Sequence, residues 1–184
     1  MTIVEFAFVG PVLMLMIFGL FDIAHTQYTS SVLNGALQKA GRDITLQSAA
    51  ASEASIDARV REQIATVMPQ GSTITIEKLS QYDFSDVGAP EDFTDMNGNA
   101  RCDANEPYVD SNNNSRWDSN RGKTGIGGAR DVVVYNATVT YPRLFPLFSM
   151  IGLPANVSLS SATVLRNQPF AQQDAKITTV RNCT

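Results

Sequence analysis

Residues 1–24 read MTIVEFAFVGPVLMLMIFGLFDIA, and this stretch decides how the rest of the chain is arranged. From Met1 to Phe21 the only charged residue is Glu5. A helix of that length, at about 1.5 Å rise per residue, is roughly as long as a bilayer core is thick. The stretch therefore predicts a membrane-spanning helix. A charge within lipid is costly, and Glu5 lies near the start of this helix. We therefore expect the Glu5 carboxylate to have a specific interaction partner.

The residues on either side of this run do not fit a secretory signal. No Lys or Arg precedes it, and the first basic residues after it are Lys39 and Arg42. A secretory signal has a basic start and a shorter apolar segment. Taken alone, the positive-inside rule would place the following domain in the cytoplasm. A basic leader that once preceded Met1 and was removed resolves this conflict, so we expect processing at this end.

Glu5 followed by Phe6, at the head of an apolar helix with an early Gly10-Pro11, resembles the class III signal of type IV pilin-like proteins. Within that superfamily, VEFAFVGPVLMLMIFGLFD is similar to the TadE-like minor pilins (pseudopilins) of the tight-adherence, or Flp, pilus. The resemblance covers about residues 1–45 and recurs weakly near YPRLFPLFSMIGLP and SATVLRNQPF. In that family a prepilin peptidase cuts after a Gly just ahead of the helix.

The resemblance implies a structural subunit of a bacterial pilus rather than an enzyme. Such a subunit spans the inner membrane once with a periplasmic head and then enters the extracellular pilus, where it primes assembly or sits at the tip and contributes to adhesion. Its helix packs with those of other pilins or minor pilins and meets the assembly machinery. Glu5 and Phe6 would serve assembly, Glu5 by neutralising a neighbour's N-terminal ammonium, while Pro11 serves assembly or only bends the span.

The remaining sequence predicts an α+β protein with a long pilin-type helix and a small head. Beyond Asp22 the apolar residues recur at helical spacing to about residue 48, which predicts a transmembrane half over residues 1–24 and an amphipathic half over 25–50. The head, residues 51–184, would contain a second helix, an antiparallel sheet and a calcium-loop insertion at about 91–124. The connection SAAASEAS should precede a helix that is capped by Ser55 and buries Ile56, Val60, Ile64 and Val67.

Three segments predict strands. STITIEKL (72–79) and DVVVYNATVTY (131–141) alternate in polarity, and the second would bury Val133, Tyr135, Ala137, Val139 and Tyr141. NVSLSSATVL (156–165) should be a strand with a bulge near Ser160-Ser161, where its pattern slips. Between the last two strands, RLFPLFSMIGLP either covers the core or presents an exposed apolar surface.

An acidic, Asn-rich tandem repeat is the one part of the sequence whose residue types and spacing indicate a specific binding site. Residues 95–106 read DMNGNARCDANE and residues 110–121 read DSNNNSRWDSNR. The two copies align at an offset of fifteen residues, and Glu106 supplies an acid at position 12 of the first copy only. The aligned pairs are Asp95/Asp110, Asn97/Asn112, Asn99/Asn114, Arg101/Arg116 and Asp103/Asp118.

This pattern predicts one or two Ca²⁺ sites. Oxygen side chains at positions 1, 3, 5, 9 and 12, with a backbone carbonyl at position 7, suit a hard cation in a short loop. The second copy has Arg121 at position 12, so it must borrow a carboxylate or remain weak. Ala100 and Ser115 replace the usual glycine at position 6, which favours a looser thrombospondin-type or dockerin-like loop over an EF-hand. A solvated turn region remains the alternative.

The two cysteines, Cys102 and Cys183, lie 81 positions apart without a CxxC or Cys/His cluster. Outside the cytoplasm such a pair favours a disulfide over two free thiols. Cys102 and Trp117 share position 8 of the two copies and could anchor both loops to the head.

Two function classes lack support in the sequence. The formal charge of −4 with 14 scattered basic residues predicts no nucleic-acid partner. One histidine, His25, and the absence of a nucleophile motif predict no enzyme. The alternative to a pilus subunit is a membrane-anchored, calcium-stabilised adhesin or binding module that never enters a filament.

Overall fold

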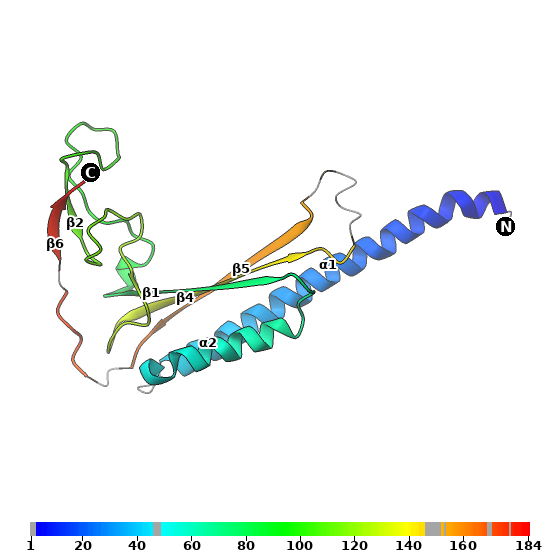
Figure 1. Ribbon diagram of the computed structural model, residues 1–184, viewed down its shortest axis with the longest axis horizontal. Coiled ribbons are helices and arrows are strands. Elements are labelled where there is room, and N and C mark those ends of the chain that lie inside the picture. The colour runs from blue at the N-terminus through cyan, green and yellow to red at the C-terminus, as the bar shows by residue number, and fades with distance from the viewer. Residues whose placement is uncertain (1–2, 46–48, 146–151, 153, 169–170, 177) are drawn as a thin grey trace. The chain divides into compact units, whose positions relative to one another are not determined.

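The computed structural model describes residues 3–45, 49–145, 152, 154–168, 171–176 and 178–184. Helix α1 (Ile3–Ile44) is a single helix of 42 residues that continues through Pro11, Gly35 and Gly41 (Figure 1). A Cβ at Gly41 would lie 2.6 Å from Leu165 Cδ2, so any other residue there would require the Leu165 side chain to shift.

Contact density divides the chain into two compact units, which are described separately. The first unit comprises Met1–Ala40, Ala54–Ile76 and Asn136–Ala162, and the second comprises Gly41–Glu53, Glu77–Tyr135 and Thr163–Thr184. Parts of one four-stranded sheet belong to each unit. The sheet has the order β3-β1-β4-β5, with β3 at Lys123–Thr124, β1 at Thr73–Gln81, β4 at Val132–Pro142 and β5 at Asn156–Arg166.

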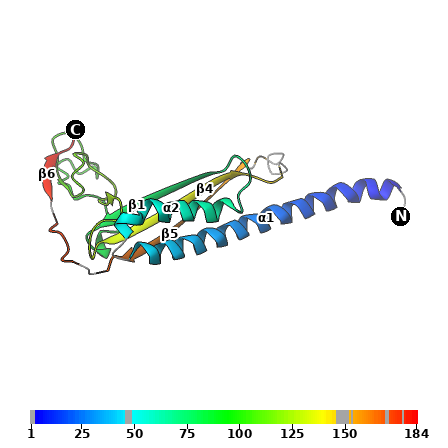
Figure 2. The ribbon, with the colours of Figure 1, turned by 60° about the horizontal axis from the view of Figure 1, so that its bottom comes forward.

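In the first unit two helices pack with the sheet. Helix α2 (Ala49–Ala65) runs alongside the second half of α1 (Figure 2). The Asn34 amide of α1 contacts the Ser161 hydroxyl of β5 at 2.5 Å, and Arg61 of α2 donates to the Ile74 carbonyl of β1. The core of this unit consists of Leu33, Ala36, Leu37 and Ala40 of α1, Ile56, Val60 and Ile64 of α2, Ala137, Val139 and Tyr141 of β4, and Val157 of β5.

Strands β4 and β5 are antiparallel. The side-chain pairs Thr138–Ser160 and Thr140–Ser158 advance in opposite directions along the two strands. Burial alternates along β4 as its sequence predicts, so its five apolar positions on one face are confirmed as core. In the second unit β1 pairs antiparallel with β3, with Leu79 opposite Thr124.

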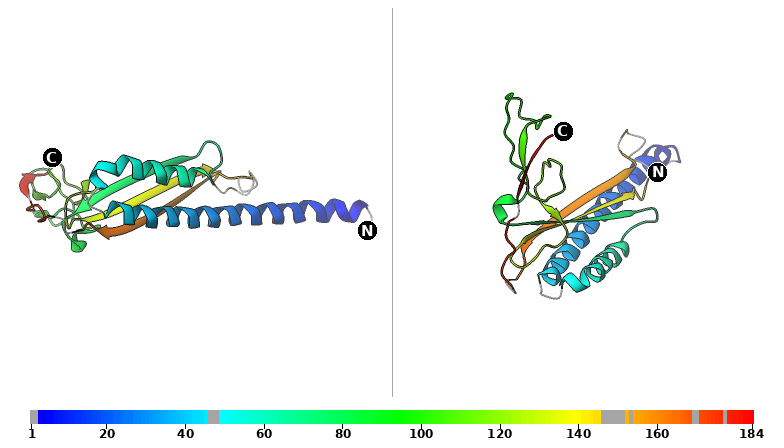
Figure 3. Two further views of the ribbon diagram at one scale, coloured as in Figure 1. Left: turned by 90° about the horizontal axis from the view of Figure 1, so that it is seen from below. Right: turned by 60° about the vertical axis from the view of Figure 1, so that its left-hand side comes forward.

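A second sheet lies in the second unit. It joins β2 (Pro107–Asp110) to β6 (Thr179–Asn182), which lies next to the C-terminus (Figure 3). The pairing is antiparallel, with Tyr108 opposite Arg181. None of β2, β3 or β6 was predicted. These strands have two to four residues each, too few for a pattern of alternation to stand out.

Four predictions about local structure are wrong. Residues 49–55 are not a connection, because α2 already begins at Ala49, and Ser55 lies inside the helix instead of capping it. The alanine-rich stretch has high helix propensity, which explains the earlier start. Val67 lies beyond the helix end.

The bulge near Ser160-Ser161 is absent, since burial alternates along β5 without a slip and leaves Val164 exposed. Most of RLFPLFSMIGLP lies outside the described residues.

Candidate functional site

Both copies of the tandem fold in the second unit, and their first aspartates close the loops in the same way. Asp95 accepts the N–H groups of Gly98 at 2.6 Å and Ala100 at 2.7 Å. Asp110 accepts the N–H groups of Asn114 at 3.1 Å and Ser115 at 2.8 Å. Each aspartate thus holds the backbone three to five residues further on in a tight turn.

The asparagines at positions 3 and 5 are also equivalent in the two loops. Asn97 and Asn99 both donate an amide N–H to Asp103 Oδ2, at 3.0 and 2.6 Å. Asn112 and Asn114 donate to Asp118 Oδ2 in the same way, at 2.9 and 2.5 Å. The structure therefore brings the predicted side-chain ligands at positions 1, 3, 5 and 9 together in each loop.

The loops reach the expected turn without the glycine at position 6. Ala100 has φ 59° and Ser115 has φ 66°, so both lie in the left-handed region. A non-glycine residue there costs roughly 1–3 kcal/mol and persists only when its surroundings fix it. The hydrogen bonds from these two N–H groups to Asp95 and Asp110 do so.

Each loop has a buried glutamate at its base. Glu106 accepts the N–H of Met96 with Oε1 and the N–H of Asp103 with Oε2, both at 2.9 Å. Glu91 accepts the N–H of Ser111 at 2.7 Å and the N–H of Asp118 at 3.1 Å, which are the equivalent positions of the second loop. The second loop therefore does have a carboxylate, and it comes from a residue four positions before the start of the tandem.

Sequence reasoning missed Glu91, although the signal was present. The repeat was aligned from Asp95, whereas its fifteen-residue register extends four residues further upstream and pairs Glu91 with Glu106. Each repeat then begins with a glutamate, but the first loop uses the glutamate of the second repeat and the second loop uses that of the first. Arg121, at position 12, instead contacts Asp86, Asp92 and the Pro90 carbonyl.

A short antiparallel pairing joins the two repeats. Phe93 forms a bridge with its repeat equivalent Tyr108. The Thr94 N–H donates to the Pro107 carbonyl and the Val109 N–H donates to the Asp92 carbonyl, both at 2.8 Å. Each of these bonds becomes the other when every residue is replaced by its equivalent in the other repeat, fifteen positions away. The two repeats are therefore related by an approximate two-fold axis. Each repeat thereby supports the loop of the other.

The two position 8 residues anchor the loops, as predicted. Cys102 forms a disulfide with Cys183, with a Cα–Cα distance of 5.9 Å, which ties the first loop to the segment after β6. Trp117 donates its indole N–H to the Glu91 carbonyl at 2.9 Å and packs edge-on against Phe93. The position 7 side chains of Arg101 and Arg116 are exposed.

The electrostatics of the loops favour ionised carboxylates. Hydrogen bonds from the Ala100 N–H and its neighbours lower the pKa of Asp95, and the Asn97 and Asn99 amides lower the pKa of Asp103. For Asp110, burial raises the pKa, but the hydrogen bonds from the Ser115 N–H and from Arg181 outweigh it and leave the pKa lowered. Arg181 of β6 donates to Asp110 at 2.7 Å.

The side chains of the two loops could hold a hard cation only after the asparagine amides change their orientation. Among the described residues no group of three or more His, Cys, Asp or Glu side chains is placed to hold a metal ion as it stands, and this holds for the carboxylates of both loops. The loops offer carboxylate and amide oxygens. The asparagines at positions 3 and 5 of both loops turn their amide nitrogens toward the aspartates, so ligation would require all four amides to rotate.

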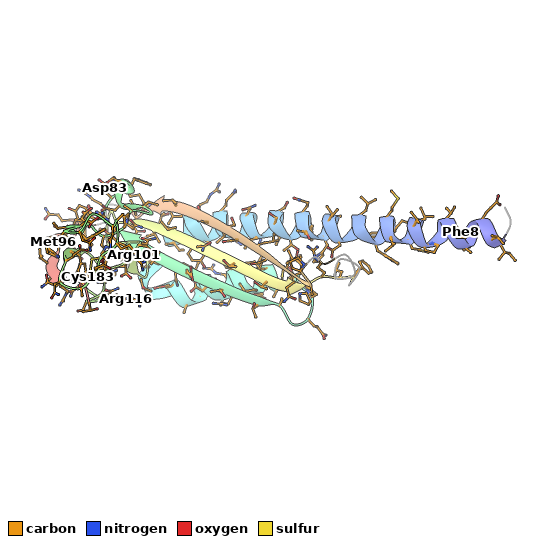
Figure 4. All side chains as sticks on the ribbon, turned by 90° about the horizontal axis from the view of Figure 1, so that it is seen from above. Phe8, Asp83, Met96, Arg101, Arg116 and Cys183 are labelled. Carbon is orange, nitrogen blue, oxygen red and sulfur yellow. A yellow bond between two sulfur atoms is a disulfide. The ribbon has the colours of Figure 1, made fainter. Side chains whose placement is uncertain are left out.

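The three predicted assembly residues lie at the start of α1, in the first unit. Phe6 is 64% exposed, Glu5 is exposed, and Pro11 lies inside the helix. The side chain of Phe8 projects from the helix in Figure 4. Among the described residues α1 is the one helix long and apolar enough to cross a membrane, and only 6% of its most apolar 18-residue window is buried. The core helix of a soluble protein would be mostly buried, so this exposure fits a membrane-anchored segment.

A comparison with known families gives a match to this segment. Residues 1–42 match the family model of TadE-like proteins. Nothing matched the chain among curated proteins or among solved structures. The TadE-like match ends within α1, so the tandem and its two loops lie outside it. The match supports an association of the N-terminal helix with the Tad pilus. It says nothing about the two loops, whose function must be inferred from their geometry.

Proposed function

We propose that this protein is a minor pilin subunit of a bacterial tight-adherence pilus. The observation that carries the proposal is the exposed apolar surface of α1, which coincides with the TadE-like match and has one acidic residue, Glu5, near its start. A helix that exposes its apolar side chains in this way needs either lipid or other helices around it. A subunit that moves from the inner membrane into a filament meets both in turn.

In this proposal Glu5 neutralises the N-terminal ammonium of a neighbouring subunit. A carboxylate removed from water needs a counter-charge, and a second subunit brings one at the right depth in the helix bundle. The subunit is present in few copies and primes assembly or sits at the tip, beside other minor pilins. A contribution to surface adhesion follows from a tip position.

The test compares piliation in strains that carry Glu5→Gln and Glu5→Asp. Glu5→Gln removes the charge at nearly constant shape, so we expect loss of pili with normal levels of the folded protein in the membrane. Glu5→Asp keeps the charge and should retain part of the assembly. Normal piliation in the Glu5→Gln strain would contradict the assembly role. A subunit that stays in the membrane and never reaches filaments would instead be an anchored adhesin or binding module.

We further propose that the two loops bind Ca²⁺ and stiffen the second unit. Asp95, Asp103 and Glu106 would supply carboxylate oxygens in the first loop, and Asp110, Asp118 and Glu91 would supply them in the second. The amides at positions 3 and 5 and the carbonyls of Arg101 and Arg116 would complete each site. With several neutral ligands, the affinity should lie in the range of extracellular modules, on the order of 10⁻⁴–10⁻³ M.

Titration calorimetry of the full chain in detergent tests the calcium proposal directly. We expect two sites per chain for Ca²⁺ and weaker heat for Mg²⁺, because Mg²⁺ prefers a smaller octahedral shell with retained waters. Absence of any calcium heat at millimolar concentrations would rule out the sites without affecting the pilin proposal, since the two rest on different units.

A further inference from the structure

The first residues of the connection between β4 and β5 lie against the apolar half of α1. The rings of Phe145 and Phe18 stack, with 4.7 Å between their centroids and 27° between their planes. Both residues belong to the first unit, and β4 ends beside α1 (Figure 1). Phe18 lies in the run from Met1 to Phe21, in which Glu5 is the only charged residue. A segment outside α1 therefore reaches the part of that helix that the sequence predicts to lie in lipid.

Arg143 fixes this connection to α1 at the first charged residue beyond the apolar run. Its Nη1 contacts Oδ2 of Asp22 at 2.5 Å. Its backbone N–H donates to the Ala155 carbonyl at 3.0 Å, and its Nε donates to the Pro154 carbonyl at 3.1 Å. The two ends of the connection are thus held to each other and to α1 at the level of Asp22.

The contact between Phe145 and Phe18 lies closer to the N-terminus of α1 than this ion pair. Phe18 precedes Asp22 by four residues, which is about 6 Å along the helix axis. Charged groups are costly in hydrocarbon, so they favour the boundary of a bilayer core over its interior. With the boundary at the ion pair of Asp22 and Arg143, the Phe145 ring lies on the lipid side of it.

The surface around this contact is apolar and open. Between Pro11 and Leu20 only Phe18 and Gly19 are half-buried, and the other residues are exposed. Leu144, next to Phe145, is 42% exposed. The connection therefore covers one side of α1 at this level and leaves apolar side chains of both segments in the same surroundings. If α1 is in lipid there, Leu144 meets the same acyl chains.

We propose that Leu144 and Phe145 insert into the outer leaflet of the inner membrane and dock the first unit on the bilayer surface. This inference rests on the membrane-spanning α1 of the proposed function and adds a second membrane contact to it. Apolar and aromatic side chains beside a basic residue are the usual composition of an interfacial anchor. The docking fixes the first unit against the membrane, instead of leaving it to swing from a single helix.

Electron paramagnetic resonance of a nitroxide at Leu144→Cys tests the docking in the full chain. The two native cysteines are joined in a disulfide, so the introduced thiol is the one available for labelling. The chain is reconstituted as a single copy per nanodisc of phosphatidylcholine and phosphatidylglycerol, so that no second subunit can cover the label. Collisions of the label with dioxygen, which concentrates in lipid, are compared with its collisions with a water-soluble nickel chelate.

Two reference labels on α1 lie on opposite sides of Asp22. Met14→Cys, in the apolar run, is the lipid reference, and Lys39→Cys is the water reference. Lys39 is exposed and lies seventeen residues beyond Asp22, about 26 Å along the helix. We expect the ratio of dioxygen to nickel collisions at Leu144→Cys to exceed that at Lys39→Cys several-fold and to approach that at Met14→Cys.

The reference labels separate failure of the docking from failure of the membrane span. A Leu144→Cys label in water, together with a Met14→Cys label in lipid, would overturn the docking and leave the span intact. A Met14→Cys label in water would contradict the span and the docking with it. If the Leu144→Cys label is shielded from the nickel chelate only when several copies share a nanodisc, a second subunit covers this surface and the lipid docking is overturned.

Discussion

Glu91 and Glu106 lie fifteen residues apart in the sequence and accept equivalent pairs of backbone hydrogen bonds. Glu106 does so at the base of the first loop and Glu91 at the base of the second. Glu106 accepts the N–H groups of Met96 and Asp103, and Glu91 accepts those of Ser111 and Asp118. Both glutamates are at most 3% exposed. The two repeats therefore form one closed structure, in which a change at either glutamate acts on a defined loop.

Replacing Glu91 should abolish one calcium site and keep the other. Glu91→Gln keeps the shape but removes the charge from the second loop, so calorimetry should show one Ca²⁺ per chain instead of two. Glu77→Gln, at an exposed position of β1, is the matched control and should retain both. Two unchanged sites in Glu91→Gln would show that this glutamate is not a ligand.

Removing calcium should lower the melting temperature. At a concentration ten times the Kd, each site stabilises the folded state by about 1.4 kcal/mol. For a chain of this size that corresponds to roughly 3–6 °C per site. Circular dichroism melts with and without EGTA measure the shift, and limited proteolysis should show new cleavage between residues 95 and 121. Equal melting temperatures and equal cleavage patterns would contradict the prediction.

Without metal, the second loop should resist mild acid. The pKa of Asp110 is lowered in the folded chain, so its ionised form stabilises the fold above the unfolded value of about 3.9. This stabilisation is lost as the pH falls through the lower, folded pKa. Fluorescence of Trp117, the one tryptophan, should stay constant from pH 7 to about pH 4 and change below it. In Asp110→Asn the acid transition should be missing or much smaller.

The disulfide should contribute strongly to stability. Closing a loop of 81 positions restricts the unfolded chain by about 4 kcal/mol in the chain-entropy account. Urea unfolding of Cys102→Ser/Cys183→Ser should show a loss of that order. Reduced wild type is the control and should match the double variant, and a difference below about 1 kcal/mol would refute the estimate.

A buried ion pair in the first unit should be sensitive to the loss of one partner. Arg143 contacts Asp22 of α1, whose side chain is 1% exposed, at 2.5 Å. Arg143→Met leaves that carboxylate without its counter-charge and should cost about 3–5 kcal/mol. Asp22→Asn/Arg143→Met should recover most of the loss, because neither charge remains. Equal stability of the single and double variants would show that the pair is not coupled.

The parts of the fold that were predictable are those governed by local periodicity. Helix α1 follows from an unbroken apolar run, and β4 follows from strict alternation through Val133 to Tyr141. The start of α2 was misplaced because a low-complexity alanine stretch was taken for a connection, whereas its helix propensity continues the helix. The slip in the pattern of β5 reflected Val164, an apolar residue that the structure leaves exposed.

The sequence by itself determined the apolar anchor, the pairing of the two cysteines and the fifteen-residue register of the loops. These depend on residue type and spacing, which are visible in one dimension. Only the tertiary structure decided that Glu91 serves the second loop, that Arg121 turns away from it, and that the buried side-chain oxygen of Gln81 has no hydrogen-bond partner. Each of these depends on which segments meet across the antiparallel pairing of Phe93 with Tyr108 or at the β1–β3 edge, and residue spacing does not specify such contacts.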